Sequence, residues 1–290
     1  MTAFAPGADP SLFDPPRPAV VEAVGRALAE DLLPLGDLTA SLLDPAAQGH
    51  LVIAAREPGV IAGQWCAETA FARVGPDLKV DWRRPDGAAV APGDVVATVS
   101  GELRAILTAE RTALNFLQLL SGTATATRAY VEAVAGTRCQ ILDTRKTLPG
   151  LRFLEKYATR MGGATNHRMG LWDAAMIKDN HVAVAGGVGE AVARARAAGV
   201  TRIICEVDHL EQIEPAIAAG ANHLLLDNMG PAMLAEAVAI IAGRAESEAS
   251  GGVNLASIGA IAASGVDFVS VGRLTQSAPA ADIGLDFGVI

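Results

Sequence analysis

Residues 188–227 have the sequence VGEAVARARAAGVTRIICEVDHLEQIEPAIAAGANHLLLD. Two short apolar runs, RIICEV and HLLLD, follow Ala-rich stretches with helical spacing. Similar runs recur at CQILD (139–143), AAMIK (174–178) and FVSVG (268–272), with a weaker one near residues 246–249. Because strands that alternate with helices pair in parallel through right-handed crossovers, we expect one α/β sheet of six or seven strands.

Polar residues end nearly every one of these apolar runs. A doubly wound sheet would gather such residues at one switch point. Polar groups at the end of every strand instead indicate a barrel whose carboxyl face carries the site, although each group taken alone could simply begin a loop. We therefore predict an incomplete or irregular α/β barrel. The strand ends are Asp143-Thr144-Arg145-Lys146, Lys178-Asp179-Asn180-His181, Glu206 with Asp208, Asp227-Asn228, and Gly272-Arg273.

The first part of the chain predicts a different, α+β architecture. A long helical pattern from about Thr108 leads out of it, and the strand-like segment 276–290 is expected to return to it. We predict an N-terminal α+β sandwich domain over residues 1–115, joined by residues 276–290, and a barrel domain over residues 116–275. The elements expected in the N-terminal part are helices at 18–33 and 65–74, and short strands within 50–63 and 86–103.

Composition excludes several classes of protein. The proline-rich N-terminus lacks the basic and apolar regions of a signal peptide, and no run approaches the roughly 20 apolar residues of a membrane helix. Cys66, Cys139 and Cys205 are odd in number and in no metal-binding pattern, so we expect buried core residues and a reducing compartment. These features predict a soluble cytoplasmic protein.

Cations are concentrated in one segment of an acidic chain. Seven Lys or Arg residues lie between Asp143 and Lys178, although the formal net charge of the whole chain is -9. This contrast favours a small anionic ligand over nucleic acid, which calls for a broad basic face. Arg152, Lys156 and Arg160 have helical spacing with Glu155, which predicts a solvent-exposed helix face. The remaining cationic candidates for the anion site are Arg145, Lys146, His167, Arg168 and Lys178.

Two carboxylates and a glycine-rich loop complete the candidate site. Glu206 and Asp227 end successive strands and could hold Mg²⁺ or sugar hydroxyls, with Asp208 as the alternative to Glu206. General acid chemistry is disfavoured because so many cations depress carboxyl pKa values. Ser250-Gly251-Gly252 precedes a helical stretch, and with Gly272 it predicts a phosphate cradle. No nucleotide-binding glycine motif or redox motif is present in the sequence.

Taken together, these segments resemble the quinolinate phosphoribosyltransferase family, the carboxylating nicotinate-nucleotide pyrophosphorylases, over nearly the whole length. The family belongs to the type II phosphoribosyltransferases. The resemblance implies transfer of a phosphoribosyl group from 5-phosphoribosyl 1-diphosphate (PRPP) to quinolinate, in NAD biosynthesis, with Mg²⁺. The matching segments, in order, are GDLT (36–39), ERTALNFLQLLSG (110–122), DTRKTLPGLR (143–152), NHR (166–168), IKDNH (177–181), EVD (206–208), LLDN (225–228) and EASGGV (248–253).

The resemblance also assigns roles to individual residues. Quinolinate would be held by Arg145, His167 and Arg168, with Lys178 also in reach. Lys146 and Lys178 would face PRPP and its diphosphate. Glu206 and Asp227 would hold ribose hydroxyls or Mg²⁺, in part through PRPP. The 5′-phosphate would rest on Ser250, Gly251, Gly252 and Gly272.

The family's quaternary structure extends the expectation to a homodimer with shared active sites, and a higher oligomer stays open. Arg111 matches the arginine that completes the neighbouring subunit's site. The sequence departs from the family at Ala164, where a third glycine is usual, and at Gln276, where a histidine is common. Neither departure touches a proposed ligand-binding group.

Two other functions stay open on the sequence. One is a related enzyme on the same scaffold, acting on nicotinate or belonging to the molybdate-associated homologues. The other is a non-catalytic sensor of a phosphorylated sugar. A nicotinate enzyme has no need of four carboxylate-binding residues, and a sensor has no need of both lysines and both carboxylates.

Overall fold

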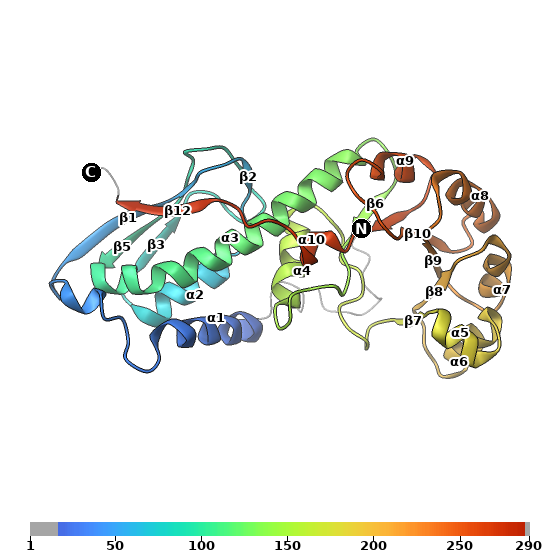
Figure 1. Ribbon diagram of the computed structural model, residues 1–290, viewed down its shortest axis with the longest axis horizontal. Coiled ribbons are helices and arrows are strands. Elements are labelled where there is room, and N and C mark those ends of the chain that lie inside the picture. Colours follow the sequence, from blue (N-terminus) through green and yellow to red (C-terminus); the bar gives the residue numbers. More distant parts are fainter. Residues whose placement is uncertain (1–16, 288–290) are drawn as a thin grey trace. The chain divides into compact units, whose positions relative to one another are not determined.

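The computed structural model describes residues 17–287 (Figure 1). The described chain forms two compact units. Residues 17–128, 147–163 and 274–287 form the antiparallel unit, and residues 129–146 and 164–273 form the parallel unit. Most of the expected proline-rich N-terminal segment, and the last three residues of the C-terminal segment, lie outside the described residues. The domain boundaries expected from the sequence stay a prediction.

The antiparallel unit is built on a four-stranded sheet. Strand β1 (Gln48–Ala55) pairs with β5 (Val95–Glu102) on one side and with β12 (Ile283–Phe287) on the other. Strand β3 (Lys79–Trp82) pairs with the far side of β5, which gives the order β12-β1-β5-β3. The C-terminal segment thus contributes an edge strand. Two further short strands, β2 (Gly59–Val60) and β4 (Ala89–Val90), pair with each other.

Helices cover one face of this sheet. On β1, Leu51, Ile53 and Ala55 are buried in alternation with more accessible residues, as one covered face requires. Phe71 and Leu117 belong to the same core, and each such buried side chain contributes roughly 1.5–3 kcal/mol. The covering helices are α1 (Arg17–Leu32), α2 (Gln64–Val74) and α3 (Leu103–Ala133), with a short helical turn, η2, at Ala40–Leu42.

The prediction of an exposed face on helix α4 (Arg152–Met161) is wrong, because Arg152 and Arg160 are half-buried and the other two residues of that face are fully buried. The side chains of Glu155 and Lys156 are completely buried. The reason is tertiary packing on several sides of α4. Tyr157 donates a hydrogen bond from its hydroxyl to Asp86 at 2.7 Å, while apolar residues of α4 join the core of the antiparallel unit. The spacing of charged residues along a helix does not show which distant segments pack around it.

The parallel unit confirms the predicted α/β architecture. Its six strands have the order β6-β11-β10-β9-β8-β7, and all neighbouring pairs are parallel. The weak run near residues 246–249 is the central strand β10. Within residues 17–287 no ladder joins β6 to β7, so the sheet is an incomplete barrel. The strands are β6 (Gln140–Leu142), β7 (Ala175–Ile177), β8 (Ile203–Val207), β9 (His223–Asp227), β10 (Glu246–Ser250) and β11 (Phe268–Ser270).

Helices α5 to α9 alternate with these strands in the sequence. Figure 1 shows α6, α7, α8 and α9 following the curve of the strands along one side. The opposite side of the sheet is left for residues that face inward, as expected where helices cover the outside of a barrel. The helices are α5 (Asp179–Ala185), α6 (Val188–Ala197), α7 (Ile213–Ala218), α8 (Pro231–Ile241) and α9 (Ile258–Ala263). A helical turn, η3, lies at Leu210–Gln212, and α10 (Arg273–Gln276) follows β11.

The three cysteines are core residues, as predicted. Cys66, Cys139 and Cys205 are buried free thiols, and burial raises the pKa of each to about 12. A thiol with so high a pKa supplies almost no thiolate at neutral pH and is a poor nucleophile. Among residues 17–287, no helix combines the length and apolar character needed to span a bilayer.

Candidate active site

Strand register brings the polar strand ends of the parallel unit together. Leu225 on β9 pairs with Glu206 on one neighbouring strand and with Glu248 on the other. Because paired residues point to the same side of a sheet, both carboxylates share one face. Asp227, two residues after Leu225, lies on that face too. Lys178 follows β7 directly and is in register beside Glu206.

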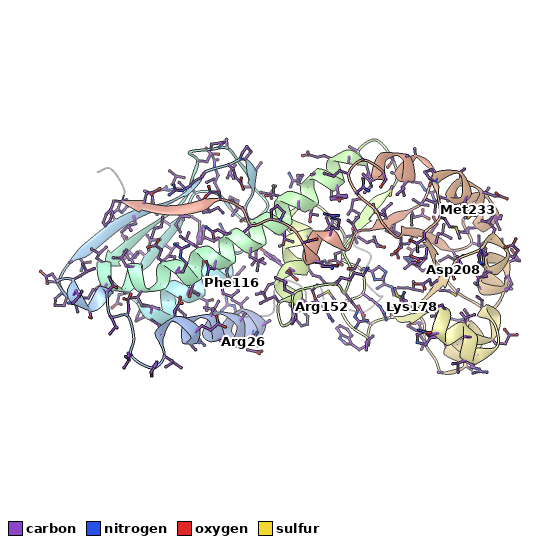
Figure 2. All side chains as sticks on the ribbon, in the orientation of Figure 1. Arg26, Phe116, Arg152, Lys178, Asp208 and Met233 are labelled. Carbon is purple, nitrogen blue, oxygen red and sulfur yellow. The ribbon has the colours of Figure 1, made fainter. Side chains whose placement is uncertain are left out.

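Lys178 and Glu206 form an ion pair between these adjacent strand ends. The Glu206 side chain is only 9% exposed, whereas that of Lys178 is 45% exposed. The buried carboxylate therefore holds one side of the ammonium group and leaves the other side open. Such an ammonium is a compact point charge suited to a phosphate or carboxylate. Lys178 is labelled in Figure 2 close to the end of β7.

Asp143 anchors the Asn166-His167-Arg168 segment to the end of β6. Its Oδ1 accepts the backbone N–H of His167 at 2.9 Å, and its Oδ2 accepts the Asn166 amide at 2.5 Å. All four residues are buried. A buried carboxylate that accepts two hydrogen bonds from one segment fixes the course of its backbone. Asp143 is thus a structural support of the site that the sequence alone did not assign.

Arg168 is buried within range of the charge of a second guanidinium group, that of Arg145. Its Nη1 donates to the carbonyl oxygen of Ala174 at 3.1 Å, and its Nη2 lies 3.5 Å from the sulfur of Met176. Burial lowers the pKa of Arg168, and the charge of Arg145 lowers it further. Among the described residues, no acceptor takes the buried Nε–H of Arg145. Two neighbouring guanidinium groups, one with an unused donor, form a site that an anion would stabilise.

Lys146 lies across Gly272, at the ends of β6 and β11. A β-carbon on Gly272 would lie 3.1 Å from Cδ of Lys146. The lysine backbone N–H donates to Thr144 Oγ1 at 3.0 Å, which shapes the turn before the side chain. The structure therefore brings together two residues predicted for the PRPP site, and glycine leaves the lysine room to pass.

The loop after β10 presents unused backbone donors. Gly251 and Gly252 have φ values of +99° and +60°, in the region that favours glycine. A β-carbon on Gly251 would lie 2.0 Å from Oδ1 of Asn228. In the described part of the chain, neither glycine N–H donates to a protein acceptor. Free N–H groups in a glycine turn match a phosphate oxygen, and Ser250 pairs with Asp227 at the start of this loop.

The carboxylates do not form a metal cage by themselves. Among the described residues, no group of three His, Cys, Asp or Glu side chains is placed to hold a metal ion. Glu206 binds Lys178, and Asp227 accepts the Asn228 amide at 2.5 Å. Mg²⁺ usually takes one or two protein carboxylates together with waters and substrate phosphates. The donor set therefore fits Mg²⁺ that arrives with a diphosphate. Asp208 is exposed, and its backbone N–H donates to Gln212 at 2.7 Å.

Arg111 belongs to the antiparallel unit, on helix α3, apart from the other predicted residues in the sequence. Its side chain is exposed. The neighbouring Glu110 is partly buried, and burial raises the pKa of its carboxyl while the charge of Arg111 opposes that rise. The role of Arg111 in a shared site stays a prediction.

A buried chain of acids and histidines underlies the site and was not predicted. Glu248 Oε2 lies 2.6 Å from Nε2 of His223 and 3.1 Å from Nε2 of His167. The other nitrogen of His223, Nδ1, lies 3.1 Å from Glu246 Oε2. Phe268 stacks on the His223 ring at 5.7 Å. The sequence signal was an acidic residue in the middle of a buried strand.

A cavity of about 760 Å³ lies at the opposite, amino ends of the strands. Arg202, Asn222 and Glu246 line it, together with Asp267. None of the residues predicted to bind substrate lines this cavity. We therefore place the candidate active site at the carboxyl ends, where the cations and the glycine loop converge.

Two family models match the chain, and together they cover most of its length. The model of the quinolinate phosphoribosyl transferase N-terminal domain matches residues 37–121, and that of the C-terminal domain matches residues 123–286. The chain belongs to the quinolinate phosphoribosyl transferase family. Both halves of the molecule, and not the parallel unit alone, therefore share the family's architecture.

Individual relatives of the quinolinate phosphoribosyl transferase family agree with this assignment. The chain is 45% identical to a carboxylating nicotinate-nucleotide pyrophosphorylase of Mycobacterium leprae over 92% of this chain and 97% of that protein. It is 40% identical to quinolinate phosphoribosyltransferase [decarboxylating] 1b of Nicotiana tabacum, over 89% and 79% of the two chains. The structure of the nicotinate-nucleotide pyrophosphorylase from Francisella tularensis superposes with a TM-score of 0.91 at 39% identity, covering 94% and 97% of the two chains.

Proposed function

We propose that this chain catalyses the reaction of quinolinate with PRPP to give nicotinate mononucleotide, CO₂ and diphosphate, a step of NAD biosynthesis. The observation that carries the proposal is the pair of arginines Arg145 and Arg168, whose charges act on each other in the same unit as the Lys178–Glu206 ion pair. Membership of the family supports the same activity. It is a pentosyl transfer, in the class of the glycosyltransferases.

Quinolinate carries two adjacent carboxylates on a pyridine ring, and two arginines match that charge pattern. A guanidinium group binds a carboxylate through two parallel N–H donors. Arg168 donates a hydrogen bond to the carbonyl oxygen of Ala174, and Arg145 has an unused Nε–H. We assign one carboxylate to each arginine, with Lys178 as a further cation in reach. His167 stays a predicted contributor to quinolinate binding.

We assign PRPP to the glycine loop after β10 and to Lys146, at the carboxyl ends of the same strands. The free N–H groups of Gly251 and Gly252, with the Ser250 hydroxyl, suit its 5′-phosphate. Lys146, which crosses Gly272, suits the diphosphate. Glu206 and Asp227 suit the ribose hydroxyls because carboxylate oxygens accept hydrogen bonds from them.

The chemistry needs positioning and charge more than a proton carrier. The ring nitrogen of quinolinate attacks the anomeric carbon while the bond to diphosphate breaks, through an oxocarbenium-like state. Lys146 and Lys178 stabilise the negative charge on the leaving diphosphate. The product ring is a pyridinium. When its 2-carboxylate leaves as CO₂, the ring accepts the bond's electrons, and a proton from water then replaces the carboxylate.

Mg²⁺ is proposed as the cofactor of this reaction. Glu206 and Asp227 would hold it, directly or through the hydroxyls and phosphates of PRPP. When bound it supplies positive charge to the diphosphate. The lack of a three-ligand cluster among the described residues fits an ion shared with the substrate.

A homodimer with shared sites, working in the cytoplasm, completes the proposal. Exposed Arg111 on α3 would reach quinolinate in the neighbouring subunit. Subunits with Arg111→Ala and subunits with Lys178→Ala, each inactive alone, should regain activity when mixed. Mass spectrometry of differently labelled subunits must first prove exchange. A mixture that exchanges fully without regaining activity contradicts the shared site.

The choice of substrate separates this proposal from the alternative of a related enzyme that acts on nicotinate. Quinolinate and nicotinate should be compared side by side, with PRPP and Mg²⁺, by chromatography of the nucleotide product. We expect nicotinate mononucleotide from quinolinate at a kcat/KM at least about 100-fold higher, since the second carboxylate adds charged hydrogen bonds. Preferential use of nicotinate would refute the proposal, and PRPP binding without turnover of either base would favour a sensor.

A further inference from the structure

Four buried or half-buried side chains form a continuous chain beneath the site, which we call the acid–histidine chain: Glu246, His223, Glu248 and His167. The side chains of His167 and His223 are 4% and 3% exposed, and that of Glu248 is fully buried. Glu246 is 54% exposed and marks the outer end. Each member has a hydrogen-bond partner within the chain, and both histidines use Oε2 of Glu248, so that its Oε1 is buried with no partner among the described residues.

Geometry assigns the protons on His223. Each of its ring nitrogens faces a carboxylate oxygen, Nδ1 at 3.1 Å from Glu246 and Nε2 at 2.6 Å from Glu248. Carboxylates only accept hydrogen bonds, so both nitrogens carry a proton and the ring is an imidazolium. Burial would lower the pKa of His223, but the two carboxylates raise it to about 9. Burial would raise the pKa of Glu248, but its two histidines hold it well below the usual range.

Geometry also assigns the tautomer of His167. Its Nδ1 accepts the backbone N–H of Arg168 at 2.7 Å, so Nδ1 carries no proton. The proton therefore resides on Nε2, which donates to Glu248 at 3.1 Å. Both ring nitrogens are then engaged by the protein. The charge of Glu248 also acts on Arg168, where it opposes the lowering of the guanidinium pKa by burial.

We propose that Glu248 is a positioning residue that fixes His167 as its Nε2–H tautomer, so that His167 pins the backbone of Arg168 and aims its guanidinium at the substrate carboxylate. His167 then contributes to quinolinate binding through Arg168 and not through its own N–H. The substrate part of this inference rests on the proposed function. The tautomer part stands on the protein alone.

Nitrogen-15 NMR of protein labelled at histidine tests the tautomer directly. The chain has five histidines, so the spectrum is tractable, and a His167→Gln variant identifies the signal. We expect His167 to show a protonated Nε2 and an unprotonated Nδ1, and His223 to show two protonated nitrogens, at pH 7.5. A protonated Nδ1 on His167, or exchange between tautomers, would overturn the proposal, whether or not the protein turns over quinolinate.

Kinetics of three variants then test the consequence for Arg168. Glu248→Leu removes the acceptor, Glu248→Gln keeps an oxygen that can accept from His167, and Glu246→Leu is the matched control. Glu246 lies two residues earlier on the same strand face and contacts His223 but not His167. For Glu248→Leu we expect KM for quinolinate to rise about tenfold, the effect of one lost hydrogen bond, with KM for PRPP changed less than about twofold.

Rescue separates positioning from folding. Glu248→Gln and Glu246→Leu should keep KM for quinolinate within about threefold of wild type. Equal losses in all three variants, or a loss in Glu248→Leu that falls equally on both substrates, would overturn the positioning role. If Glu248→Leu does not fold, a tenfold loss in Glu248→Gln with the wild-type tautomer retained would contradict it as well. Inactive wild-type protein with the expected tautomers would refute the proposed function and leave the acid–histidine chain standing.

Discussion

Lys178 and Glu206 form an ion pair across the carboxyl ends of two neighbouring strands, β7 and β8. The pair is asymmetric, because the carboxylate is nearly buried while the ammonium group is half exposed. A charge held in this way is already placed before substrate arrives, so little reorganisation is needed during the reaction.

Removing the charge of Glu206 should impair catalysis. Glu206→Gln leaves Lys178 without its ionic partner, and we expect kcat to fall at least about tenfold, since hydrogen bonds to charged groups contribute roughly 1.5–3 kcal/mol. Asp208→Asn is the matched control, because Asp208 is exposed two residues further on. Steady-state kinetics of both variants decide the matter. A larger effect at Asp208 would transfer the role to that residue.

We expect the arginines of the site to bind quinolinate and Lys146 to bind PRPP. Arg145→Ala and Arg168→Ala are expected to raise KM for quinolinate about 10- to 100-fold, because each removes a charged donor to a carboxylate. Lys146→Ala should instead raise KM for PRPP, since Lys146 lies beside Gly272 and the phosphate loop. Initial-rate measurements with each substrate varied separate the two effects. Wild-type kinetics in all three variants would be incompatible with the site.

The glycine loop offers a test that changes no charge. A methyl group at Gly251 would collide with Asn228, and the backbone φ of +99° at this position is unfavourable for alanine. We expect Gly251→Ala to raise KM for PRPP about tenfold, from strain of roughly 1–3 kcal/mol. Gly230→Ala is the control, because Gly230 has a φ of -74° and open space around it. Equal effects of the two substitutions would argue against a phosphate cradle.

Buried Glu155 should make folding stability depend on pH. Burial raises its pKa to about 7, while Leu148 N–H, which donates to it at 2.9 Å, opposes that rise. The folded state therefore holds this proton more tightly than the unfolded state, so Glu155 stabilises the fold at low pH. That stability is lost as pH rises from about 4.5 to about 7.

A neutral side chain at position 155 removes this loss. Glu155→Gln can still accept the Leu148 hydrogen bond, so it should be more stable than wild type by roughly 3 kcal/mol at pH 8 and by no more than about 1 kcal/mol at pH 5. Urea unfolding at both pH values measures the difference, with exposed Glu236→Gln as the control. A wild-type advantage at pH 8 would mean that Glu155 is ionised and stabilising.

Much of this architecture is predictable because it depends on local pattern. The six parallel strands follow from apolar runs, and even the weak run at 246–249 forms β10. The strand-end position of Lys178, Glu206 and Asp227 follows from the same pattern, because parallel strands place their carboxyl ends at one edge. Strand β3 was missed because it has only four residues, so its alternation of polar and apolar side chains is too short to stand out.

What escaped prediction depends on partners far apart in the sequence. Lys156 is buried on α4 because several distant segments surround that helix, including Asp86, 71 residues before Tyr157. Glu248 is linked to His167 across 81 residues. Its local sequence shows only an acidic residue in a weak strand. Such contacts become visible only when the strand order is known.

The most direct test of the account is release of CO₂ from quinolinate labelled with carbon-14 at its 2-carboxylate. PRPP and Mg²⁺ are each added or omitted, and nicotinate mononucleotide is measured in the same samples. The account predicts release that requires both additions, with one equivalent of nucleotide for each CO₂. Well-folded protein that releases no CO₂, or that releases it without PRPP, would contradict the proposed reaction.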